Sequence, residues 1–212
     1  MKPLATLLAL CLLFFGPSVY SQRFGAGAIL GLNASQIDGD NQFGYRKFGL
    51  AGGLRGIAHL SARFDLQVEM LYSLRGSAAK TRGYKGPATP VDIKLQYAEA
   101  PLLLNYKVLE NWDGQYVLHF CTGFSYARLL GSEVKERRST PTNQEDFNIL
   151  EAEKDFKRNE IGWVLGAAFL PIPKLSVELR HVFALNPLFK SDMHDGRTLR
   201  SYYLQLQVAY LL

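Results

Sequence analysis

The sequence is poor in cysteine, with two cysteines in 212 residues, Cys11 and Cys121. Because Cys11 lies in an N-terminal segment that we expect to be removed, the mature chain keeps a single thiol, which can form neither an intramolecular disulfide nor a multi-cysteine metal site. An excess of charge is also missing, since the formal net charge is +5 and the basic residues are dispersed. This balance predicts no nucleic-acid partner.

The common catalytic and nucleotide-binding signatures are absent as well. The sequence contains no Walker loop, no GxSxG and no HExxH. The stretch GAGAILG spaces its glycines one residue wider than a GxGxxG loop, and no helix is expected after it to supply phosphate-binding amides. The histidines do not have the spacing of a metal site: His59, His119, His181 and His194. We predict a protein that is not an enzyme and that binds no cofactor and no metal.

Long apolar runs are missing beyond the N-terminus. The segment MKPLATLLALCLLFFGPSVYSQ has one lysine and an apolar run over residues 4–15, followed by small residues at Val19 and Ser21. This run is too short for a helix that spans a bilayer, which needs about 20 residues, but it is typical of a secretory signal peptide. We predict a signal peptide over residues 1–21, cleaved before Gln22, and one domain over residues 22–212.

The rest of the chain is rich in segments in which apolar and polar residues alternate. In RFDLQVEMLYSLR, residues 63–75, every second side chain from Phe64 to Leu74 is apolar, and the intervening ones include Asp65, Glu69 and Arg75. This period of two predicts a β-strand. It recurs in eight segments: 23–35, 47–59, 63–75, 91–108, 115–130, 159–170, 174–185 and 201–212. Pro101 interrupts the fourth of them and predicts a bulge there, because proline removes a donor from the ladder.

Alternation by itself fits two opposite structures. A soluble barrel or sandwich turns its apolar face inward, whereas a membrane barrel turns it toward lipid and fills its lumen with polar groups. Here the polar face is crowded with glycine, as the interior of a narrow barrel requires: Gly25, Gly27, Gly31, Gly49, Gly53, Gly123, Gly162 and Gly166. It also carries charges of both signs that can pair across a lumen: Arg55, Asp65, Glu69, Arg75, Lys94, Glu99, Glu160, Glu178 and Arg180.

Aromatic residues and loop lengths favour the membrane barrel as well. Aromatic side chains lie toward strand ends, where they would form interfacial girdles: Phe24, Phe48, Tyr72, Tyr97, Tyr106, Tyr116, Tyr126, Trp163, Tyr202 and Tyr210. Short links near Ser61, at 110–115 and at 171–174 alternate with long polar ones at 35–46, 76–90, 131–158 and 187–198. Outer-membrane barrels have short periplasmic turns and long outer loops. We therefore predict an all-β fold, an eight-stranded antiparallel transmembrane up-and-down β-barrel.

The chain resembles the PorT-like outer-membrane β-barrel proteins of Gram-negative bacteria and, more loosely, the small OmpA/OmpX-type barrels. The resemblance covers residues 22–212 and rests on GAGAILGLNASQIDGD, YAEAPLLLNYKV, EIGWVLGAAF and the tyrosine-rich last strand. It implies a bacterial outer-membrane location, contact with outer-membrane lipid and lipopolysaccharide, and insertion by the barrel assembly machinery. It also implies an alternative function, an accessory role in type IX protein secretion.

Two groups of residues are the candidate functional sites. The first is a lumen charge network of Arg55, Asp65, Glu69, Arg75, Glu178 and Arg180, which we interpret as a salt-bridged plug, because eight strands leave little bore for water. The second is the basic loop around Lys80, Arg82 and Lys85, which could contact lipopolysaccharide phosphates or an acidic protein partner.

These residues predict a monomeric barrel with a structural or partner-binding role through its extracellular loops. Besides the secretion role, three alternatives stay open at this stage. They are a small-solute channel, a soluble lipocalin-like ligand-binding barrel, and an outer-membrane hydrolase that uses a rim cluster around Asp192, His194 and Asp195.

Overall fold

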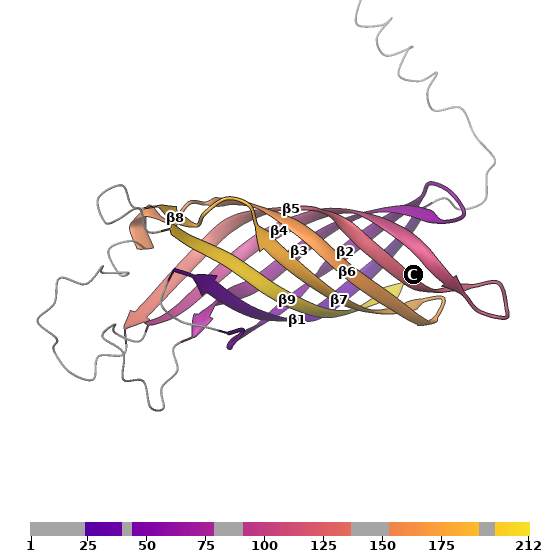
Figure 1. Cartoon of the computed structure of the whole chain (residues 1–212), viewed down its shortest axis with the longest axis horizontal. Coiled ribbons are helices and arrows are strands. Elements are labelled where there is room, and N and C mark those ends of the chain that lie inside the picture. The colour runs from indigo at the N-terminus through magenta and orange to yellow at the C-terminus, as the bar shows by residue number, and fades with distance from the viewer. Residues whose placement is uncertain (1–23, 40–43, 79–90, 137–152, 191–197) are drawn as a thin grey trace, which may run out of the picture.

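The computed structural model describes residues 24–39, 44–78, 91–136, 153–190 and 198–212, and within these ranges the chain forms a closed antiparallel β-barrel (Figure 1). Eight long strands follow one another around it in chain order, and β9 pairs back with β1 to close the sheet. Their bounds are β1 Phe24–Asp38, β2 Lys47–His59, β3 Phe64–Ala78, β4 Val91–Glu110, β5 Tyr116–Glu136, β6 Asn159–Ile172, β7 Leu175–Ala184 and β9 Thr198–Leu211. The predicted fold class is confirmed.

The two ends of the barrel differ. At one end, on the right in Figure 1, β2–β3, β4–β5 and β6–β7 are joined by short turns, and the C-terminal end of β9 lies there too. The β4–β5 turn is held by Asn111, whose side-chain oxygen accepts hydrogen bonds from the backbone N–H groups of Asp113 at 3.0 Å and Gln115 at 2.8 Å. The strand ends that the long connections join lie at the other end, as the loop lengths predict.

Several strands extend into segments that the sequence predicted to be loops. β1 continues to Asp38, β3 to Ala78 and β5 to Glu136, all inside segments expected to be loops. A two-residue strand, β8 (Phe189–Lys190), pairs with β9 within another. β4 has 20 residues and β5 has 21, about twice the 9–11 residues that a tilted strand needs to cross a membrane. The sheet therefore extends beyond the membrane at the long-loop end.

Apolar side chains cover the outside of the barrel and polar ones fill the inside. On β3, Met70 is 73% exposed, whereas the neighbouring Glu69 is 1% exposed. This arrangement is the opposite of that in a soluble protein, and it continues around the barrel. Exposed apolar residues on the outer surface include Leu30, Leu54, Phe120, Phe124, Leu179 and Leu206. None of the described residues forms a helix that is long and apolar enough to span a membrane. The predicted direction of the two faces is confirmed for the membrane-crossing part of the strands.

Two residues in the outer half of β4 lie on the opposite face of the sheet from the one predicted. Tyr97, expected in the aromatic girdle, is fully buried in the lumen, and Lys94, expected inside, points outward with its side chain 50% exposed. The bulge is displaced too: Pro101 pairs in register with Ser125, and the register shift toward β5 falls between Gln96 and Tyr97. Pro101 instead interrupts the pairing with β3, because proline has no N–H to donate. No residues pair between Val68↔Leu102 and Leu71↔Glu99.

The inward glycines are required by the backbone of the neighbouring strand. A Cβ on Gly53 would lie 1.9 Å from the carbonyl oxygen of Met70, and one on Gly123 would lie 2.1 Å from that of Leu102. Both distances are below any real carbon–oxygen contact. The glycines predicted from a narrow lumen therefore allow close approach of adjacent strands, which the tight coiling of a small barrel imposes.

Candidate functional site: the barrel lumen

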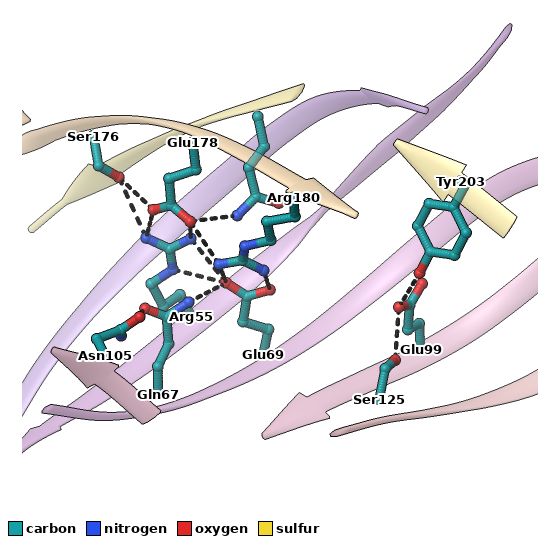
Figure 2. A network of polar contacts seen from close by, with 11 residues as sticks. Arg55, Gln67, Glu69, Glu99, Asn105, Ser125, Ser176, Glu178, Arg180 and Tyr203 are labelled. Carbon is teal, nitrogen blue, oxygen red and sulfur yellow. Dashed lines mark hydrogen bonds and ion pairs between the residues drawn. The ribbon is translucent and has the colours of Figure 1, made fainter. Parts of the chain in front are cut away.

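Four charged side chains form a layer across the lumen (Figure 2). Arg55 donates from Nε to Oε1 of Glu69 at 2.9 Å and from its terminal nitrogens to both carboxylate oxygens of Glu178, at 2.5 and 2.9 Å. Arg180 donates to Glu69 at 2.8 and 3.1 Å and to Glu178 at 2.5 Å. Two cations therefore alternate with two anions in a closed ring that carries no net charge.

The strand register places these four residues. Arg55 and Glu69 are directly opposite partners on β2 and β3, while Glu178 and Arg180 are two residues apart on β7 and so point to the same side. Gly166 on β6 makes room for Arg180, because a Cβ there would lie 2.7 Å from the arginine Cγ. All four charged side chains are at most 4% exposed.

Neutral polar groups add further hydrogen bonds to the two carboxylates of this layer. Ser176 and Gln207 donate to Glu178 at 2.7 and 2.9 Å. Gln67 donates to Glu69 at 2.6 Å and accepts from Asn105 at 2.8 Å. Buried charges are tolerated only when they are paired and hydrogen-bonded in this way. The structure brings Arg55, Glu69, Glu178 and Arg180 together in the lumen. That they act as a plug stays a proposal.

Arg75 belongs to a second layer nearer the long-loop end. It donates to Glu160 at 2.9 Å, lies 3.5 Å from Glu99, and is stacked between the rings of Tyr97 and Tyr203, with 4.2 and 4.3 Å from its guanidinium carbon to the ring centroids. Glu99 also accepts hydrogen bonds from the Ser125 and Tyr203 hydroxyls (Figure 2). The single network expected from the sequence is therefore two separate layers.

An apolar cap lies beyond the second layer. Its buried members come from seven elements and connections and pack as one cluster: Ile37, Ile93, Leu95, Tyr97, Ala127, Val134, Phe156, Leu188, Phe189 and Leu199. Phe156 and Leu188 come from segments that sequence analysis treated as polar loops, and only their isolated apolar side chains marked them out. Phe156 follows a short 3₁₀ turn, η1 (Glu153–Asp155). Within the described residues, the lumen is closed toward the long-loop end.

Asp65 has a third location, at the short-turn end of the lumen. Its Oδ1 lies 2.8 Å from Nδ1 of His59 and 2.9 Å from Nζ of Lys107. Together with His119 and the lower side of the first layer, these groups line a cavity of about 380 Å³. We call this cavity the vestibule. It was not predicted as a site from the sequence.

Other sequence candidates do not fall among the described residues of the lumen. Lys80, Arg82 and Lys85, and the rim candidates Asp192, His194 and Asp195, lie outside the described residues. His181 is on the outer face of β7, where its Nε2 is 2.6 Å from the Tyr45 hydroxyl. Among the residues that the structure describes, no group of three or more His, Cys, Asp or Glu side chains could hold a metal ion.

Aromatic side chains mark where the outer surface meets the membrane interfaces. Most of the predicted girdle is exposed on the outside: Phe24, Phe48, Tyr72, Tyr106, Tyr126, Trp163 and Tyr210. Near the short-turn end, Phe64 and Tyr106 face each other across β3 and β4 with ring centroids 5.1 Å apart. An apolar exterior with aromatic residues near both strand ends, around a polar closed lumen, defines a transmembrane β-barrel.

The family assignment agrees with this class. The sequence model of the outer membrane protein beta-barrel domain family matches residues 18–190, most of the chain. The chain therefore belongs to this family, and its location is the bacterial outer membrane. In that membrane the short turns face the periplasm and the long-loop end faces outward. No curated protein matches the chain by sequence.

Several solved barrels are similar in structure. Ail of Yersinia pestis, solved in complex with the heparin analogue sucrose octasulfate, is 12% identical, with 90% of this chain and 100% of that chain covered and a TM-score of 0.45. Neisserial surface protein A is 12% identical, with coverages of 89% and 97% and a TM-score of 0.46. OprG of Pseudomonas aeruginosa is 11% identical, with coverages of 89% and 95% and a TM-score of 0.42.

Proposed function

We propose that the protein is a closed, non-enzymatic barrel, monomeric in the outer membrane, that anchors a partner-binding surface at its outer end. The observation that carries this proposal is the closure of the lumen. From the periplasmic side, a solute would meet the ring of Arg55, Glu69, Glu178 and Arg180, then the layer around Arg75, and then the apolar cap. Passing each layer would require breaking buried ion pairs or opening packed apolar contacts. This closure argues against a solute channel, and the apolar exterior argues against a soluble lipocalin-like barrel.

The outward extension of the sheet supplies a surface for partners. Beyond the girdle residue Tyr72, the outer faces of β4 and β5 become charged: Glu133 pairs with Lys135 at 2.6 Å and with Lys94 at 3.4 Å. Hydrogen bonds from Lys135 and then Lys94 hold the pKa of the Glu133 carboxyl below its usual range. A rigid sheet that carries such groups above the membrane supports loop residues, among them the proposed contacts Lys80, Arg82 and Lys85 with lipopolysaccharide phosphates or an acidic protein.

Single-channel recording tests the closed lumen. The mature barrel, inserted into planar bilayers beside a general porin as the positive control, is expected to give no discrete conductance steps. Reproducible steps that scale with salt concentration would contradict the closed anchor and favour a channel.

Lipid retention tests the partner-binding surface. A variant with Lys80, Arg82 and Lys85 replaced by glutamine is expected to co-purify with less lipopolysaccharide per barrel, and the difference should shrink at high salt because the contacts are electrostatic. A Lys174→Gln variant at the periplasmic end serves as the matched control. Equal retention in all three proteins would exclude this loop as the contact.

The resemblance to PorT-like proteins supports one finer assignment, an accessory role in type IX secretion. A deletion strain would then fail to export type IX cargo, and normal export would exclude the role. Sequencing the N-terminus of the mature protein tests cleavage before Gln22.

A further inference from the structure

The vestibule lies at the periplasmic end of the lumen, next to the first charge layer. Its inner wall is the lower side of the first charge layer, where Arg55 and Glu178 are already bonded to each other (Figure 2). Its outer walls come from the ends of β2 to β7 and from the β4–β5 turn. A volume of about 380 Å³ is within the range of small-molecule sites, which is roughly 300–1,000 Å³. Barrel closure alone does not require such a space.

The vestibule contains polar nitrogens whose hydrogen-bonding capacity is not used up within the described residues. Nε2 of His119 is buried and has no hydrogen-bond partner among the described residues. Lys107 has three N–H bonds, and Asp65 is the one described carboxylate with which it forms an ion pair. The His59 side chain, which meets Asp65 through Nδ1, is 43% exposed at the mouth. A buried polar atom without a partner is costly, so its presence needs an explanation.

Both carboxylates of the vestibule already have cationic or hydrogen-bonding partners. Glu178 accepts from Arg55, Arg180, Ser176 and Gln207. Asp65 contacts both His59 and Lys107 through the same oxygen. With neutral imidazoles, the charged groups that face the cavity balance, Arg55 and Lys107 against Asp65 and Glu178. What is in surplus is N–H donors, and the chemistry that matches them is an oxyanion.

We infer that the vestibule is a binding site for a small periplasmic molecule that bears a carboxylate or phosphate group, held by Lys107 and His119. The oxyanion accepts hydrogen bonds from the ammonium group of Lys107 and from Nε2 of His119 in the tautomer that carries its proton there. Asp65, which also contacts His59, holds Lys107 at the wall.

The test uses the mature barrel in lipid nanodiscs with ¹⁵N-labelled histidine. Inorganic phosphate and succinate are titrated separately at constant ionic strength, with chloride as the reference, and the side-chain resonances of His59 and His119 are followed. The expected result is saturable shifts with one or both oxyanions, the tighter one defining the ligand class. Shifts that match chloride or never saturate would overturn the inference.

Variants identify the donors. Lys107→Met is expected to weaken binding at least tenfold, and His119→Gln, read through His59, is expected to weaken it severalfold. Lys174→Met, at the same end of the barrel but outside the cavity lining, should bind as the wild type does. Heat-modifiability on gels confirms that each variant is folded, and if Lys107→Met fails to fold, Lys107→Gln takes its place. Unchanged affinity in both the Lys107 and His119 variants would refute the site.

Discussion

Replacing Arg180 by methionine is the perturbation that tests the first charge layer most directly. Arg180 makes three hydrogen bonds, two to Glu69 and one to Glu178, and its side chain is 1% exposed. Methionine fills a similar length without a charge, so Glu69 and Glu178 would share the single cation Arg55. Removing one partner from a buried ion pair costs about 3–5 kcal/mol, because a buried charge is left uncompensated. We expect the free energy of unfolding to fall by about this amount.

The double variant Arg180→Met with Glu69→Gln separates charge balance from packing. It restores neutrality, since Arg55 then faces Glu178 alone through its two bonds at 2.5 and 2.9 Å. We expect it to be more stable than Arg180→Met by about 1–3 kcal/mol, the usual size of a coupling between residues in one network.

Urea-induced unfolding from lipid vesicles measures both effects, with the fluorescence of Trp163 on the outer face as the reporter. Lys94→Gln is the matched control, because its ion pair with Glu133 is about half exposed on both sides and such pairs contribute little. If Arg180→Met changes stability by less than about 1 kcal/mol, or if the double variant is the less stable of the two, charge compensation does not hold the layer together.

Three further predictions follow from the packing and the surface charges. Gly53→Ala should prevent assembly into the heat-modifiable barrel, because its Cβ would lie 1.9 Å from a carbonyl oxygen, whereas Gly56→Ala, whose nearest neighbour is 4.0 Å away, should assemble normally; equal assembly of both would refute the reasoning. Cys121 is buried and free, so a maleimide should label it only in the unfolded protein, and rapid labelling of the folded barrel would show an open lumen. Lys135→Gln should raise the pKa of Glu133 toward its usual value, measured by NMR titration, because the lysine hydrogen bond lowers it. The ion pairs of Glu133 are complete at neutral pH and are lost as the pH falls through this lowered pKa. An unchanged pKa in the variant would show that the pair does not form in solution.

Much of the site could be predicted from side-chain parity. Once the membrane barrel was inferred, every second residue pointed inward, which placed Arg55, Glu69, Glu178 and Arg180 in the lumen. Their division into layers could not be predicted in the same way. How deep a residue lies in the lumen depends on the stagger between neighbouring strands, and the stagger follows from the closure of the whole barrel. For this reason Arg75 was grouped with Arg55, although it binds Glu160 in another layer.

In the outer part of β4, side-chain polarity is a poor guide to which residues face the lumen. Inside the membrane, apolar residues face outward, but beyond it the outer face meets water and the rule reverses. Tyr97 therefore turns inward and Lys94 outward. The sequence does not mark the point of this reversal, because the strand continues without a turn.

The sequence by itself determined the strands, their number, the two faces and the short-turn end, because a period of two and the spacing of turns are local properties of the chain. The tertiary structure decided which charges meet, since Arg55 and Glu178 are 123 positions apart and touch only across the closed barrel. It also decided that Phe156 and Leu188 cap the lumen and that Asp65, Lys107 and His119 surround a cavity. Such contacts arise from the curvature and stagger of the closed sheet, which brings distant residues to the same depth in the lumen.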